Sequence, residues 1–179
     1  MPRRFALVVL LCEDRQQECF AYRYLRHKGL SRYRIHVRKA PSAAGAAEQY
    51  VRQQYPAEVA ALRAKAHSSA GLIAVLDVDS TSPQFRLNQL AEALQDAHQP
   101  PRAKDEPIAV LLPNRNIETW IHHLLGESVN EEDEYSKFSD EQRKCEPAVR
   151  EFLRRCPDDM GNSLPSLQAA CEELTRFFG

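Results

Sequence analysis

The sequence contains no apolar run near the roughly 20 residues that a membrane-spanning helix requires. Its N-terminal apolar segment, residues 5–12, is short. Glu13 and Asp14 follow it where a signal peptide would have a small-residue cleavage site. We therefore expect residues 5–12 to form a buried strand rather than a targeting or membrane segment.

Cysteine occurs five times, an odd number, and no two cysteines have C-x-x-C spacing. This pattern argues against a disulfide framework and against a zinc ribbon. A reducing cytoplasm is the expected compartment. Cys12, inside an apolar segment, and Cys171, on an apolar helix face, are expected to fill the core.

An excess of charge of either sign is also absent, because 24 Lys and Arg stand against 25 Asp and Glu. The overall charge does not indicate a nucleic-acid-binding protein, although a local basic patch can bind without such an excess. Hydrophobic residues make up 43% of the 179 positions, which is enough for the core of one domain.

Continuous apolar segments alternate with helical patterns in the first part of the chain. Strands are expected at 5–12, 33–39, 71–79 and 108–113, and helices at 16–30, 46–67 (interrupted at Pro56), 82–98 and 116–125. The residues expected to face inward from helix 82–98 are Phe85, Leu87, Leu90, Ala91 and Leu94. This alternation predicts an α/β fold with a mostly parallel, Rossmann-like central sheet flanked by helices.

The character of the chain changes after Gly126. Residues 127–142 are acidic and irregular, and two further helices are expected at about 143–155 and 163–178. We expect residues 1–126 to form the α/β core and residues 127–179 to form a helical C-terminal extension packed on it. The extension is interpreted as a cap over the active edge of the sheet, serving as a lid or as a surface for a homodimer.

Acidic residues follow the expected strands at the points where ligands of parallel sheets bind. Glu13 ends the first strand, Asp77 and Asp79 end the third, and residues 114–118 follow the last. Because alternate residues of a strand point to the same side, Asp77 and Asp79 are expected to reach one cation. Oxygen ligands without paired His or Cys favour Mg²⁺ or Mn²⁺ over zinc. Such ions also take phosphate oxygens, which indicates a phosphate-ester substrate.

These residues resemble the signature of the Toprim superfamily, which has a glutamate at the end of the first strand and Asp-x-Asp on a later one. Here the segments are C-E-D, with Glu13, and L-D-V-D, with Asp77 and Asp79. The resemblance covers about residues 5–125 and implies a Toprim-like fold. It also implies that Glu13 is a general base or acid that helps to hold the metal, and that Asp77 and Asp79 hold Mg²⁺.

A narrower likeness covers more of the chain. The segments C-E-D-R-Q-Q-E-C-F-A-Y-R-Y-L, L-D-V-D-S, L-P-N-R-N-I-E-T-W-I-H-H-L-L and E-Y-S-K-F are similar to small stand-alone Toprim-like proteins, related to OLD-type nucleases. Some of these accompany restriction or anti-phage genes. The resemblance implies functional importance for Glu118 and Trp120 on the helix after the last strand, and for a downstream lysine, Lys137.

Four further candidates each have two interpretations. Glu118 is either a metal ligand or an acid favoured in the first turn by the helix dipole, and Asn116 either orients a ligand or caps that helix. Arg15 and Lys137 are either phosphate-binding groups or solvated side chains. A zinc site formed by Glu118 and His122 is disfavoured.

The segment 22–39 is rich in Lys and Arg and contains interleaved tyrosines. Such a segment can follow a nucleic-acid backbone. It is equally typical of an exposed helix and an edge strand, where basic side chains discourage aggregation.

Three functions remain open on the sequence. The first is a divalent-metal-dependent nuclease that acts on DNA or RNA, either alone or as a subunit of a defence or repair system. The second is a non-catalytic Toprim-like assembly subunit beside a larger partner such as an ATPase. The third follows from a resemblance of L-D-V-D-S-T to the haloacid-dehalogenase phosphatases, in which Asp77 would be the nucleophile and Asp79 the general acid.

Overall fold

The computed structural model describes residues 3–42, 46–65 and 68–179. In these residues the chain forms four strands, six α-helices and one short 3₁₀ helix. In chain order they are β1 (Leu7–Cys12), α1 (Arg15–His27), η1 (Arg32–Arg34), β2 (Ile35–Lys39), α2 (Ala47–Ala64), β3 (Ala70–Val75), α3 (Pro83–Asp96), β4 (Ile108–Leu111), α4 (Ile117–Leu124), α5 (Glu141–Arg155) and α6 (Pro165–Phe178).

The four strands form one parallel sheet in the order β2-β1-β3-β4. This confirms the prediction of an α/β fold with a parallel, Rossmann-like sheet. All six residues of β3 are buried, as expected of a central strand with helices on both faces. In β2, at one edge, only Ile35 is buried.

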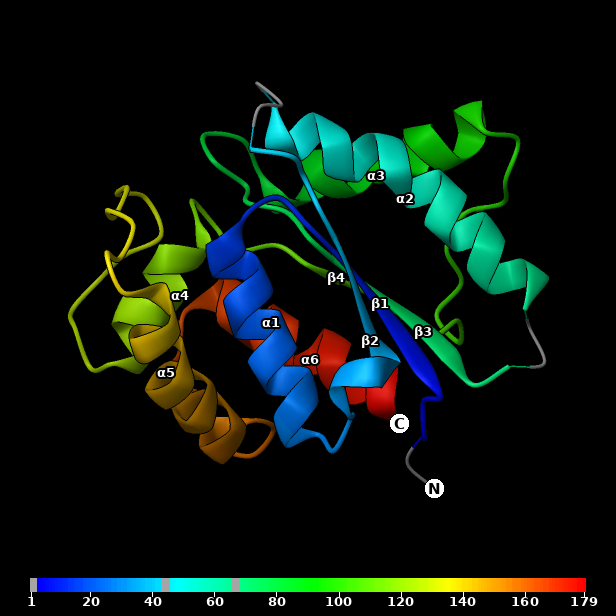
Figure 1. The fold of residues 1–179 in the computed structure, drawn as a ribbon. Coiled ribbons are helices and arrows are strands. Elements are labelled where there is room, and N and C mark those ends of the chain that lie inside the picture. The colour runs from blue at the N-terminus through cyan, green and yellow to red at the C-terminus, as the bar shows by residue number, and fades with distance from the viewer. Residues whose placement is uncertain (1–2, 43–45, 66–67) are drawn as a thin grey trace.

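Helices cover both faces of the sheet and separate the core into two parts (Figure 1). Helices α2 and α3 cover one face with Val51, Tyr55, Val59, Leu90 and Leu94. Helices α1, α4, α5 and α6 cover the other, and their aromatic residues Phe20, Trp120, Phe152 and Phe177 are almost completely buried. The C-terminal helices therefore supply part of the main core.

Several elements differ from the sequence predictions in their extent. Helix α2 continues through Pro56, because the buried Val51, Tyr55 and Val59 pack on both sides of the proline. Strand β3 ends at Val75 instead of Asp79, and residues 33–34 belong to η1 instead of β2. Residues 66–67 of the predicted helix and residues 43–45 of the preceding loop lie outside the described residues.

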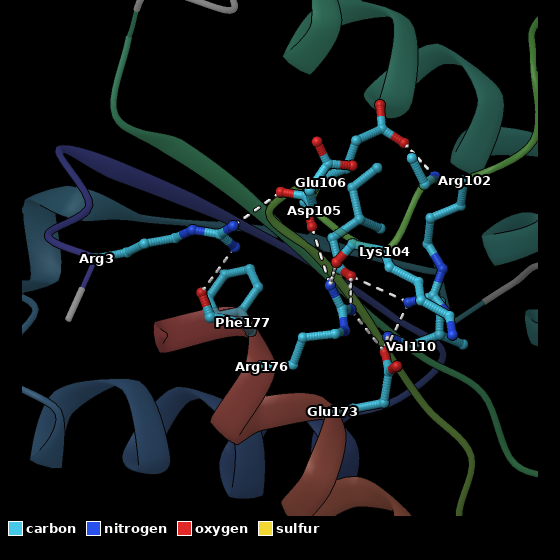
Figure 2. Close-up of polar contacts among 11 residues, drawn as sticks. Arg3, Arg102, Lys104, Asp105, Glu106, Val110, Glu173, Arg176 and Phe177 are labelled. Atoms are coloured by element: carbon cyan, nitrogen blue, oxygen red, sulfur yellow. Dashed lines mark hydrogen bonds and ion pairs between the residues drawn. The ribbon is translucent and has the colours of Figure 1, made fainter. Parts of the chain in front are cut away.

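The outer edge of β4 is closed by side chains from α6 and from the loop before β4 (Figure 2). The backbone N–H of Val110 donates to Oε2 of Glu173 at 3.0 Å. Arg102 and Arg176 both donate to the carbonyl of Ile108 and both pair with Glu173. Because these side chains hydrogen-bond the N–H of Val110 and the carbonyl of Ile108, these backbone groups are not available to pair with another strand.

Cys12, a free thiol in β1, and Cys171, on α6, are both buried in the core, as expected. The expectation of no disulfide is wrong, because Cys171 is joined to Cys156, which follows the last residue of α5, so the bond links that helix to α6. The pair is formed by the packing of two helices, which the spacing of the cysteines does not reveal. None of the helices in the described residues is both long and apolar enough to cross a membrane.

Candidate functional site

Three buried carboxylates follow the carboxyl ends of the neighbouring strands β1, β3 and β4. Glu13 comes directly after β1, Asp77 lies two residues beyond β3, and Glu118 is in the first turn of α4, after β4. All three residues are buried. Because β1, β3 and β4 are adjacent and parallel, their ends bring together residues that are far apart in the chain. We call Glu13, Asp77 and Glu118 the carboxylate cluster.

The backbone after β3 connects Asp77 to Glu13. The N–H groups of Leu76 and Val78 donate to the carbonyls of Leu111 and Pro113, on the β4 side. Because successive N–H groups of an extended chain point in opposite directions, the N–H of Asp77 points toward β1. There it donates to Oε1 of Glu13, with an N···O distance of 3.1 Å.

Gln17, in the first turns of α1, holds Glu13 in place. Its side-chain Nε2 donates to Oε2 of Glu13 at 3.3 Å, and its Oε1 accepts from the backbone N–H of Glu13 at 2.9 Å. The Gln17 amide also acts against the rise in the pKa of Asp77. Gln17 is itself completely buried, so it holds Glu13 from inside the fold. Gln17 was not among the residues predicted for the site, although its position on a helix, four residues after Glu13, could have indicated it.

Burial raises the pKa of every carboxyl group in the cluster. It raises the pKa of Glu13 to about 8, and the charges of Asp79 and Asp14 add to the effect. It raises the pKa of Glu118 to about 7, with a further contribution from Asp14. The pKa of Asp77 is raised well above its ordinary value by burial and by the charges of Glu13 and Glu118. Near neutral pH the cluster therefore has a high affinity for protons or for a cation.

Two carboxylate oxygens of the cluster are left without a hydrogen bond. Among the described residues, no partner reaches the buried Oδ1 of Asp77 or the buried Oε1 of Glu118. A buried, unpaired acceptor is costly, and a proton or a cation would relieve this cost. The donors are all oxygen, which suits Mg²⁺ or Mn²⁺. Within the part of the chain that the structure describes, no three His, Cys, Asp or Glu side chains already stand as a metal-binding group.

Asp79 is not part of the carboxylate cluster. Its φ of 56° lies in the left-handed region, so the alternation of a strand does not extend to it. Its largely exposed carboxylate pairs with Nη2 of Arg86 at 3.0 Å. Asp79 thus lies at the solvent-exposed rim of the carboxylate cluster, close enough for its charge to raise the pKa of Glu13. The predicted side-by-side arrangement of Asp77 and Asp79 required β3 to continue to Asp79, and β3 ends at Val75.

The buried Arg86, on α3, organises the loop between Asp77 and Asp79. Its Nε donates to the carbonyl of Asp77 at 3.1 Å, and its Nη1 pairs with Glu48 at 2.9 Å. Arg86 was not predicted to be buried, because the apolar pattern placed Phe85 and Ala91 on the inner face of the helix. Both are exposed, and Phe85 retains 47% of its accessible surface.

Lys137 and Asp14 form the other part of the rim. Asp14 caps α1 by accepting from the N–H of Gln17, and its Oδ2 accepts from Nζ of Lys137 at 2.9 Å. The hydrogen bond to Asp14 raises the pKa of Lys137, and the charges of Glu118 and Asp77 add to the effect. The structure therefore brings Lys137, from the irregular segment before α5, to the site.

Arg15 and Asn116 are not directed into the carboxylate cluster. Arg15 is largely exposed and lies 3.5 Å from Glu141, beside a cavity between α1 and α5. Asn116 caps α4 by accepting from the N–H of Thr119, and its Nδ2 donates to the carbonyl of Tyr135 at 3.2 Å. Its role here is to fix the start of α4, which carries Glu118.

The basic segment 22–39 divides between α1 and the edge strand. Arg38 and Lys39 on β2 pair with Glu58 and Glu18, respectively. Tyr33 is 75% exposed, and the guanidinium of Arg32 lies 4.7 Å from the centre of its ring. Arg32 and Tyr33 precede the first residue of β2, so they lie at the amino ends of the strands, at the edge of the sheet opposite Glu13.

Comparisons with known protein families, with curated proteins and with solved structures found no match to this chain. The chemistry of the site is therefore argued from its own residues.

Proposed function

We propose that the protein is a divalent-metal-dependent phosphodiester-cleaving enzyme of the Toprim type, a nuclease acting on DNA or RNA. The observation that supports this most is the buried cluster of Glu13, Asp77 and Glu118 at the ends of three parallel strands, with two oxygens lacking partners. Buried carboxylates with raised pKa values are typical of functional sites. A purely structural role would give these oxygens hydrogen-bond donors.

In this proposal each residue has a distinct part. Glu13, Asp77 and Glu118 hold Mg²⁺ or Mn²⁺, which when bound neutralises charge on the phosphate. The pKa of about 8 lets Glu13 exchange a proton near neutral pH, as a general base or acid requires. Asp79, held by Arg86, keeps a negative charge at the rim that sustains this pKa. Lys137 contacts a phosphate of the substrate.

The substrate and setting are also proposals. The exposed Tyr33 and Arg32 suit stacking on a base and contact with a phosphate, at the edge of the sheet opposite Glu13. We propose that the protein acts in the cytoplasm, as a subunit of a phage-defence or repair system, as a homodimer or beside a partner such as an ATPase.

A cleavage assay tests the proposal. Purified protein is incubated with single-stranded DNA, double-stranded DNA and RNA, with Mg²⁺ or Mn²⁺ and with EDTA. Cleavage is expected only with the metal, and Glu13→Gln is expected to lower its rate by about 10²–10⁴-fold. Asp77→Asn and Glu118→Gln should abolish it. Glu172→Gln, at an exposed position of α6, is the matched control and should cleave normally. Cleavage that survives both Glu13→Gln and Asp77→Asn would refute the proposal.

The other two functions give different results. Metal binding by calorimetry without cleavage of any substrate would favour the non-catalytic assembly subunit. A trapped phospho-aspartate on Asp77 would favour the phosphatase. The pairing of Asp79 with Arg86 argues against the phosphatase, because a general acid must be free to approach the leaving group.

A further inference from the structure

Helix α1 packs against α5 (Figure 1). Cys19, on α1, is a partly buried free thiol, and Cys145, on α5, is a completely buried one. Sγ of Cys19 lies 3.8 Å from the carbonyl oxygen of Glu141, one helical turn before Cys145. Nε2 of Gln16 donates to Sγ of Cys145 at 2.9 Å.

The surroundings make the two thiols chemically different. Nε of Arg23 donates to Sγ of Cys19 at 3.5 Å. The Cys145 thiol and the hydrogen bond from Arg23 lower the pKa of Cys19 to about 6, against the opposing effects of burial and of Glu141. In turn Cys19, together with burial, raises the pKa of Cys145. At neutral pH the pair therefore consists of a thiolate and a thiol, and the thiolate is the reactive form.

Only the thiolate can be reached from outside. A cavity of about 500 Å³ lies between α1 and α5, and Cys19 lines it together with Arg15, Arg23, Arg26 and His27. Cys145 does not line this cavity. A small oxidant therefore meets Cys19 first, where Arg23 donates to its sulfur and Glu18 and Glu146 also line the cavity. Low pKa, access and a neighbouring second thiol together are typical of cysteines that are oxidised reversibly.

We propose that Cys19 is a site of reversible oxidation by peroxides, with Cys145 as the thiol that resolves it into a disulfide. In the first step the Cys19 thiolate attacks a peroxide oxygen, the O–O bond breaks, and the leaving oxygen takes a proton as an alcohol or water. Cys19 becomes a sulfenic acid. In the second step Cys145 attacks the Cys19 sulfur, the S–O bond breaks, and the proton of Cys145 leaves with the oxygen as water. Two thiols are oxidised and one peroxide is reduced.

The first step prepares the second. The high pKa of Cys145 is due first to Cys19, and in part to the charge on that thiolate. A sulfenic acid is uncharged, so its formation removes the charge contribution. Cys145 then loses its proton more readily, next to the sulfur that it attacks. The resulting disulfide joins α1 to α5, at the base of the segment whose Lys137 binds Asp14.

Oxidation of the full-length protein tests this directly. Folded protein is treated with equimolar hydrogen peroxide, the remaining thiols are blocked, and the digest is mapped by mass spectrometry. A peptide pair joined through Cys19 and Cys145, two hydrogens lighter than the reduced pair, is expected, and a mild dithiol should reverse it. Cys12, a buried thiol whose pKa is raised, is the internal control and should remain reduced. Absence of the joined pair while Cys19 is recovered as a free thiol would overturn the proposal.

Two variants separate the steps. In Cys145→Ser the sulfenic acid on Cys19 should persist and be trapped by dimedone, whereas wild type should show little adduct because the disulfide forms. The alkylation rate of Cys19 should rise with pH to a midpoint near 6 in the folded protein and near 8.5, as for an ordinary thiol, in denaturant. Arg23→Gln should move the folded midpoint upward. The same midpoint in folded and denatured protein, or no dimedone adduct in Cys145→Ser, would refute the role of Cys19.

Discussion

At the scale of single residues, the burial of Glu118 makes the stability of the folded protein depend on pH. Glu118 is 1% exposed, and its pKa rises from 4.5 in the unfolded chain to about 7 in the folded protein. Between these values the folded state binds a proton that the unfolded state has released, so stability decreases as pH rises. The difference corresponds to about 3 kcal/mol, which is fully present below pH 4.5 and lost as the pH passes 7.

Glu118→Gln is expected to remove this pH dependence, because the amide keeps the shape of the side chain without the charge. In EDTA, the variant should be more stable than wild type at pH 8, and this advantage should shrink toward pH 5. Urea unfolding at each pH measures the free energies. Glu172→Gln, at an exposed position on α6, should follow the wild-type curve. If the wild-type and Glu118→Gln curves run parallel from pH 5 to pH 8, the proposed titration of Glu118 is wrong.

Gly71 is the position in the sheet with the least space for a side chain. A Cβ atom there would lie 2.6 Å from Cζ of Phe177 and 2.8 Å from Cε1 of Phe5, two buried rings that stack on each other. Gly71→Ala should therefore destabilise the protein by about 1–3 kcal/mol, the usual cost of overpacking. Phe177→Leu in the same chain should recover part of the loss. Gly161→Ala, where a Cβ would meet nothing within 4 Å, is the control, and equal effects of the two alanines in urea unfolding would contradict the steric argument.

The sequence predicts the positions of those site residues that directly follow the ends of strands. Glu13 and Asp77 follow apolar strands, and the rule for parallel sheets brings them to one edge. The position of Asp79 was not predictable, because its left-handed backbone turns it toward Arg86. The burial of Arg86 was hidden by a helical pattern that treats an arginine as exposed and Phe85 as buried. In the fold, the carboxylates and carbonyl around Arg86 compensate its burial.

At the scale of elements, the apolar pattern predicted all four strands and the helices between them. It failed where a neighbouring element decides the outcome. Pro56 was expected to interrupt α2, and packing of the residues on both sides of it keeps the helix continuous. The bond between Cys156 and Cys171 depends on how α5 and α6 meet, which local spacing does not encode.

The edge of β4 carries a prediction of its own. Glu173→Ala would leave the N–H of Val110 without its acceptor and separate Arg102 and Arg176 from their shared carboxylate. We expect a loss of about 1–3 kcal/mol in the free energy of unfolding, and also concentration-dependent association, because an open edge pairs with other strands. Chemical denaturation and light scattering measure the two effects. Glu172→Ala, the exposed neighbour, should show neither; a Glu173→Ala protein as stable and monodisperse as this control would contradict the edge-closing role.

At the scale of the whole molecule, the topology assembles the candidate site. The order β2-β1-β3-β4 makes β1, β3 and β4 neighbours, so the ends of three strands meet although Glu13 and Glu118 are far apart in the chain. The segment before α5 then closes the rim through Lys137. The carboxylate cluster is thus the meeting point of the sheet and the C-terminal part, and a ligand bound there should stabilise the whole fold.

This leads to a prediction on metal binding by the intact protein. At pH 8, Mg²⁺ or Mn²⁺ should raise the melting temperature, because the cation takes the place of protons that the cluster has lost. A metal at 100 times its dissociation constant contributes about 2.7 kcal/mol, or about 5–10 °C for a chain of this size. The effect should shrink at pH 5, where protons compete, and disappear in the double variant Asp77→Asn/Glu118→Gln. Potassium at equal ionic strength is the control for screening, and a metal effect that persists unchanged in the double variant would show that the cation binds elsewhere.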